Sequence, residues 1–187
     1  MEIYMDRRRD VGQGYWMSFE NHPRLEETKR SIYARCVPCL EKLYLQLQEN
    51  PDRLHLEEPL DCWKVIVVLN DFTECLDLLE SYQDKKFPVA RVVRGRVGTN
   101  NRESSNVVVI FNVYSAEERD ELFADMKELV PGITSSYDLL YERGCQDLYG
   151  LLCGDWSAWA PLTMIKNLNM VGTIREKVGR LLKGQYS

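Results

Sequence analysis

The sequence lacks the motifs by which many enzyme classes are recognised. It contains no Walker loop, no dinucleotide-binding glycine fingerprint, no HExxH helix and no G-x-S-x-G nucleophile elbow. Their absence excludes the nucleotide-binding, zinc-protease and hydrolase classes that these motifs define. No other spacing of residues identifies a reaction, and the sequence therefore favours a non-catalytic protein.

Long apolar runs, internal repeats and low-complexity stretches are also missing. No stretch approaches the roughly 18 apolar residues of a membrane-spanning helix. Residues 1–16 are polar and carry charges of both signs, unlike a secretory signal. What is present, 44% hydrophobic and 28% charged residues in a 187-residue chain, is typical of a globular protein. We therefore expect a cytoplasmic protein that makes no membrane contact.

The chain is predicted to form one domain behind a short arm. Residues 1–20 are expected to be a flexible N-terminal arm, and residues 21–187 a single α+β domain. Within it we expect a helical extension over residues 22–50, a core over residues 62–142 and a C-terminal helical segment over residues 145–187. Apolar residues at spacings of three, four and seven support the first helix. They are Leu25, Ile32, Cys36, Leu40, Leu43 and Leu47.

The middle of the chain shows strand signals with a hairpin between two of them. Runs rich in β-branched residues over 62–70, 88–97 and 106–114 predict strands. Residues 98–105, rich in glycine, asparagine and serine, predict the loop that joins the second strand to the third. Residues 134–144 are interpreted either as a fourth strand or as the start of a helix.

Helices are predicted after the first and third strands. Asp71 with Glu74, and Ser115 with Glu118, have the three-residue spacing of helix N-terminal caps, and apolar stripes follow both pairs. The resulting order of strand, helix, two strands, helix and strand is that of the ferredoxin-like split βαβ fold. We therefore predict an antiparallel sheet with two helices on one face.

Alternation along the strands predicts that the sheet is apolar on both faces. The face beneath the helices should bury Trp63, Val65, Val67, Leu69, Val107, Val109, Phe111 and Val113. The opposite face has Ile66, Val68, Val108 and Ile110 at its centre, so it also needs a cover. We expect the N-terminal and C-terminal helical extensions to provide it. A second subunit in a homodimer and a bound ligand are the alternatives.

Basic residues are concentrated in two segments, although the net charge is −5. Residues 85–102 carry six basic side chains and no acidic one, and residues 166–183 carry five basic and one acidic. Arginines on a hairpin suit a phosphate-bearing small molecule, a nucleic acid or an acidic protein. We therefore expect a non-catalytic binding or regulatory protein that presents this hairpin to an anionic partner. Its candidate ligands are Lys85, Lys86, Arg91, Arg94, Arg96 and Arg102.

The C-terminal segment offers a second basic group, on a predicted amphipathic helix. It consists of Arg175, Lys177, Arg180 and Lys183. Either basic group could instead contact acidic residues of its own chain or of a second subunit.

Six cysteines support a second functional hypothesis, a metal-binding or thiol-redox protein. Cys36 and Cys39 have the spacing of redox dithiols and zinc knuckles, and also of ordinary core positions. A zinc ion bound by these two cysteines would need two more ligands, which Cys145 and Cys153 could supply. Their separation is not a usual knuckle spacing, and packing as small hydrophobic side chains is the simpler interpretation.

A third hypothesis is an enzyme with a pocket near residues 154–161. Trp156 and Trp159 lie between a glycine and a proline, where they could line a ligand site with Asp155 as an acid or base. The alternative is that the tryptophans anchor this segment to the core. No motif identifies a reaction for such a pocket.

Overall fold

A computed structural model describes residues 1–5, 9–11, 14–21, 39–49, 51–56, 62–85, 92–100 and 106–183. The chain divides into two compact units, each built from two separate stretches of sequence. Unit 1 comprises residues 1–28 and 63–142, and unit 2 comprises residues 29–62 and 143–187. The prediction of one domain from residue 21 onward did not anticipate this division.

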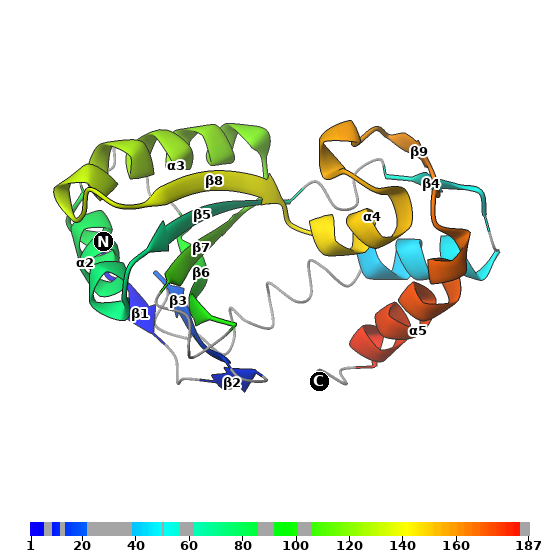
Figure 1. Ribbon diagram of the computed structural model, residues 1–187, viewed down its shortest axis with the longest axis horizontal. Coiled ribbons are helices and arrows are strands. Elements are labelled where there is room, and N and C mark those ends of the chain that lie inside the picture. Colours follow the sequence, from blue (N-terminus) through cyan, green and yellow to red (C-terminus); the bar gives the residue numbers. More distant parts are fainter. Residues whose placement is uncertain are drawn as a thin grey trace. The chain divides into compact units, whose positions relative to one another are not determined.

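Unit 1 is a mostly antiparallel sheet with two helices (Figure 1). Its elements are β1 (Tyr4–Met5), β2 (Arg9–Val11), β3 (Gly14–Glu20), β5 (Trp63–Leu69), α2 (Phe72–Asp84), β6 (Arg94–Thr99), β7 (Val107–Val113), α3 (Ala116–Leu129), the 3-10 turn η1 (Val130–Gly132) and β8 (Asp138–Arg143). The strands follow the order β1-β3-β6-β7-β5-β8, and β2 pairs with β3. The order β6-β7-β5-β8 is that of a split βαβ core, and the predicted α+β class is confirmed.

The predicted caps begin both helices of unit 1. The Asp71 carboxylate accepts a 3.0 Å hydrogen bond from the Glu74 N–H, and the Ser115 hydroxyl accepts one of 3.0 Å from the Glu118 N–H. Glu118 in turn accepts a 2.8 Å bond from the Tyr114 N–H. These contacts satisfy amides that have no partner within their helix.

The core of unit 1 lies between the helices and one face of the sheet. All eight side chains predicted for that face are at most 7% exposed, so the alternation prediction is confirmed. Phe111 of β7 makes edge-to-face contacts with Tyr82 of α2, at 5.5 Å between ring centroids, and with Phe19 of β3, at 5.2 Å. The Arg119 guanidinium of α3 lies 4.1 Å from the ring centroid of Trp63 on β5. Both helices therefore cover the same face.

The strand β3 is a difference from the sequence prediction, which placed residues 14–20 in a flexible arm. These residues pair with β6 in a continuous antiparallel register from Tyr15↔Thr99 to Glu20↔Arg94. Gly98 permits the close approach of the two strands. Its φ is +155°, and a Cβ at this position would overlap the carbonyl oxygen of Tyr15.

The Trp16 side chain of this strand packs against the apolar residues of the rear face of the sheet. Trp16 of β3 packs against Ile66 and Ile110, which are 8% and 6% exposed, and the half-buried Val68 and Val108 border the cluster. The low exposure of Ile66 and Ile110 agrees with the prediction that these aliphatic residues are shielded from water. We also predicted that the N-terminal and C-terminal helical extensions cover this face. That prediction depends on how the two units are placed relative to each other, and it stays a prediction.

Unit 2 is helical, with one short pair of strands. It contains a helix over residues 39–48, β4 (Arg53–His55), α4 (Gln146–Cys153), the 3-10 turn η2 (Trp156–Ala158), β9 (Leu162–Met164), the 3-10 turn η3 (Leu168–Met170) and α5 (Val171–Leu182). Its own core includes Leu47, Leu54, Leu152, Ile174 and Val178. Antiparallel pairing of β4 with β9 was not predicted. Of the helices described in either unit, none has the length and apolar character needed to cross a membrane.

Candidate functional site

The structure describes three of the six basic residues predicted to bind an anion, and these three have different surroundings. Arg94 is only 6% exposed, and its guanidinium lies 3.3 Å from the ring centroid of Tyr114. Across the β3–β6 register it lies opposite Glu20, which is 2% exposed. An arginine that is buried opposite a buried carboxylate and against an aromatic ring is part of the packing of the sheet. An anion in solution does not reach it.

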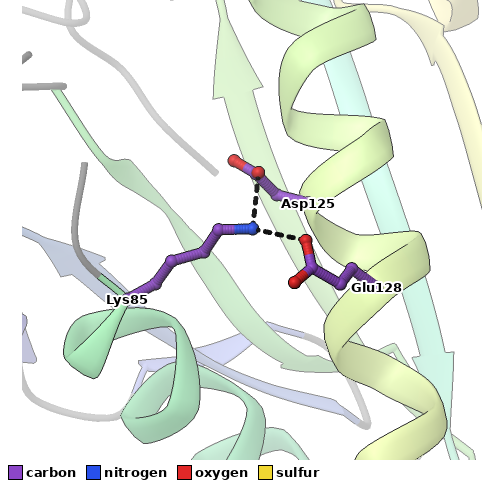
Figure 2. Close-up of polar contacts among 3 residues, drawn as sticks. All are labelled: Lys85, Asp125 and Glu128. Carbon is purple, nitrogen blue, oxygen red and sulfur yellow. Dashed lines mark hydrogen bonds and ion pairs between the residues drawn. The ribbon is translucent and has the colours of Figure 1, made fainter. Parts of the chain in front are cut away.

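Lys85 also contacts carboxylates of its own chain (Figure 2). Its ammonium group lies 2.8 Å from Oδ1 of Asp125 and 2.9 Å from Oε2 of Glu128, so it joins the end of α2 to α3. The hydrogen bond that Lys85 donates to the Asp125 carboxylate raises the pKa of Lys85. An external anion would have to displace one of these carboxylates.

Of the three described basic residues, Arg96 is the one whose side chain is exposed to solvent. It is exposed on β6, and its guanidinium lies 4.4 Å from the ring centroid of Trp16. Ser18 is opposite it in the β3–β6 register. The aromatic contact fixes the side chain while leaving it accessible. Lys86, Arg91 and Arg102 lie outside the described residues.

The basic group of the C-terminal segment lies on α5 and is accessible. Lys177, Arg180 and Lys183 are exposed, and Arg175 is half-buried. None of the ion pairs described in the structure includes these side chains. Arg180 belongs to the last turn of α5 and Lys183 is its C-cap residue, so both cations also suit the helix dipole.

Packing of α5 on its own unit fixes which face meets solvent. Ile174 and Val178 are 1% and 0% exposed in the core of unit 2. Gly179 allows the Tyr44 ring to approach, because a Cβ there would lie 3.1 Å from Cε2 of that ring. The helix therefore cannot rotate without losing this packing, and its cations stay on the opposite side.

Of the three residues predicted to line a pocket, Asp155 and Trp156 line one hollow and Trp159 lies elsewhere. An open hollow of about 560 Å³ lies on α4 and the turn that follows it. Its lining consists of Gln146, Asp147, Gly150, Leu151, Gly154, Asp155 and Trp156. Trp159 instead stacks on Tyr149, at 4.9 Å between ring centroids, and the Arg143 guanidinium lies 4.8 Å from its centroid. Trp159 therefore anchors the segment to the core of unit 2.

Asp155 begins the turn η2. Its carboxylate accepts a 2.9 Å hydrogen bond from the Ser157 N–H, and this bond lowers the pKa of Asp155. A general acid at neutral pH needs a raised carboxyl pKa. The geometry of Asp155 therefore favours a capping role over proton donation.

Three of the four cysteines proposed as zinc ligands pack in the core of unit 2. Cys153 is buried, and burial raises its pKa to about 11, so it remains a thiol at neutral pH. Cys39 and Cys145 are half-buried against the same core, and Cys36 lies outside the described residues. Within the part of the chain that the structure describes, no group of three or more His, Cys, Asp or Glu side chains could hold a metal ion.

Trp16, whose ring contacts the exposed Arg96 of unit 1, is a residue that the sequence analysis did not identify. The signal was the alternation of Tyr15, Met17 and Phe19 with Trp16 and Ser18, which is the period of a strand.

Searches for related proteins add no function to this geometry. No protein-family model, no curated protein and no solved structure is significantly similar to the chain.

Proposed function

We propose that the chain is a non-catalytic binding protein that holds an anionic partner through the solvent face of α5. One observation carries this proposal: Lys177, Arg180 and Lys183 are exposed within two helical turns, and no ion pair described in the structure includes them. Cations that take part in none of the described ion pairs keep their attraction for an external anion. Arg96 is a separate, weaker candidate on unit 1.

The charge distribution of the chain gives this face its significance. The net charge is −5, yet residues 166–183 carry five basic residues and one acidic residue. A positive face on an otherwise acidic protein orients the molecule toward polyanions and repels them elsewhere. This property supports selective docking through one surface and disfavours general adhesion.

The test is a titration of two labelled polyanions, single-stranded DNA of 20 nucleotides and poly-glutamate, followed by fluorescence anisotropy. We expect wild-type protein to bind at least one of them, with an affinity that falls between 50 and 200 mM salt, as is usual for phosphate contacts. The variant Lys177→Gln with Arg180→Gln should bind more weakly.

A matched control removes the same two charges elsewhere. Arg53 and Lys127 are exposed on β4 and α3, and Arg53→Gln with Lys127→Gln should leave binding close to the wild-type value. Circular dichroism checks that both double variants are folded. Equal losses in the two variants, or no salt-sensitive binding to either polymer, would contradict the proposal.

A further inference from the structure

We infer that the anionic partner of α5 is the phosphodiester backbone of a nucleic acid, bound without base recognition. This inference rests on the proposed function and names the chemistry of the partner. It follows from the shape of the cationic face, from the burial of the apolar face of α5 and from the identity of the neutral residues that α5 exposes.

The cations form an extended row and no cup. Lys177, Arg180 and Lys183 are three residues apart, so they advance about 4.5 Å per step along the helix axis and fan outward from a convex surface. A single phosphate is held by donors that converge on one point. Phosphates along one nucleic-acid strand recur about every 3.4 Å of helix axis, and they can meet such a row one after another.

A lipid surface fits this helix poorly. Amphipathic helices that bind membranes insert their apolar face among the lipid chains. The apolar residues Val171, Ile174 and Val178 are 6%, 1% and 0% exposed, because they form part of the core of unit 2. A bilayer would therefore receive only the charges of α5.

An acidic protein also fits less well than a nucleic acid. Protein interfaces take most of their stability from apolar or aromatic side chains at the centre of the contact. The neutral residues exposed on α5 are Gly172 and Thr173. The large exposed apolar residues of unit 2 belong to other elements: Leu45, Leu151, Leu162, Met164 and Leu168. A backbone of phosphates needs no apolar anchor.

Glu176 provides a test of whether the partner of α5 is negatively charged. It is exposed on α5 at the start of the row of cations, next to Lys177 in sequence and one turn before Arg180. A carboxylate at this position repels phosphates at a distance of about 8 Å in water, which corresponds to roughly a twofold loss of affinity. Glu176→Gln should therefore bind nucleic acid about twofold more tightly than the wild type.

The experiment measures binding of labelled oligo(dT), oligo(dA) and poly-glutamate to the full chain over a series of salt concentrations. We expect both oligonucleotides to bind with affinities within about threefold of each other, since backbone contacts carry no sequence information. In Lys177→Gln with Arg180→Gln, the slope of log affinity against log salt should become shallower by about 1.4, which is about 0.7 per lost phosphate contact.

The outcomes separate this inference from the proposed function. Preferential binding of poly-glutamate would overturn the inference and leave the proposed function in place, and absence of binding to all three polymers would overturn both. Displacement of the oligonucleotide by inorganic phosphate beyond the effect of ionic strength would also overturn the inference. So would a preference of more than tenfold for one oligonucleotide, or weaker binding by Glu176→Gln.

Discussion

The junction of Lys85 with Asp125 and Glu128 yields a quantitative prediction, because one cation contacts two carboxylates that differ in exposure (Figure 2). The Lys85 and Asp125 side chains are 21% and 14% exposed, whereas Glu128 is 73% exposed. The variants Lys85→Met, Asp125→Asn and Glu128→Gln, singly and in pairs, define two double-mutant cycles that share one residue.

We expect unequal coupling energies in the two cycles. The Lys85–Asp125 pair is largely shielded from water and should contribute about 1 kcal/mol, near the upper limit for pairs at a protein surface. The Lys85–Glu128 pair is screened by solvent and should contribute about 0.3 kcal/mol. Lys85→Met should therefore lower the free energy of unfolding by about 1 kcal/mol, which lowers the Tm by roughly 3 °C in a chain of this size.

The pH dependence of this contribution follows from the raised pKa of Lys85. Stability from a group with a raised pKa is complete below its unfolded value, about 10.4 for lysine, and is lost as the pH rises through the folded value. The difference between wild type and Lys85→Met should thus be constant from pH 6 to 9 and shrink above about pH 10.4. Urea unfolding at 25 °C measures these energies. A Glu128 coupling equal to or larger than that of Asp125 would refute the reasoning.

Two further predictions concern the sheet and the thiols. Gly98→Ala should destabilise the protein by more than about 3 kcal/mol in urea unfolding, because its Cβ would overlap the Tyr15 carbonyl and push β3 from β6. Gly150→Ala is the control, since a Cβ there meets nothing within 4 Å and alanine favours a helix, and an equal cost for both changes would argue against the β3 pairing. Burial raises the pKa of Cys75 to about 12 and that of Cys153 to about 11, so both should resist iodoacetamide at pH 8 until urea unfolds the chain, as judged by peptide mass spectrometry. Rapid alkylation of either native thiol would show that it is not buried.

Local signals predicted the central elements of unit 1 well. The strands β5 and β7 are apolar except for one polar residue each, and the side chains of Asp71 and Ser115 form the helix caps that their spacing predicts. The strand β3 was missed because its partner β6 lies about 80 residues away and no feature of residues 14–20 names that partner. The pairing of β4 with β9 joins segments more than 100 residues apart and has the same cause.

The candidate site was harder to predict for a related reason. Arg94 and Arg96 have the same residue type and lie on the same face of one strand, yet the first is buried and the second exposed. The difference comes from Glu20 on β3 and from Tyr114, which meet Arg94 only in the folded sheet. Lys85 meets Asp125 and Glu128 for similarly non-local reasons. Composition located the basic segments, whereas tertiary pairing determines which cations remain accessible.

The interleaved order of the two units has a consequence for biosynthesis. Strand β3 is made early but cannot pair until residues 94–99 have left the ribosome, and β4 must wait for residues 162–164. Each unit needs residues from two separate stretches of sequence, and no single proteolytic cut releases either unit whole. Strands β3 and β4 therefore stay unpaired while the intervening residues are synthesised, and chaperones can bind their exposed edges during that time.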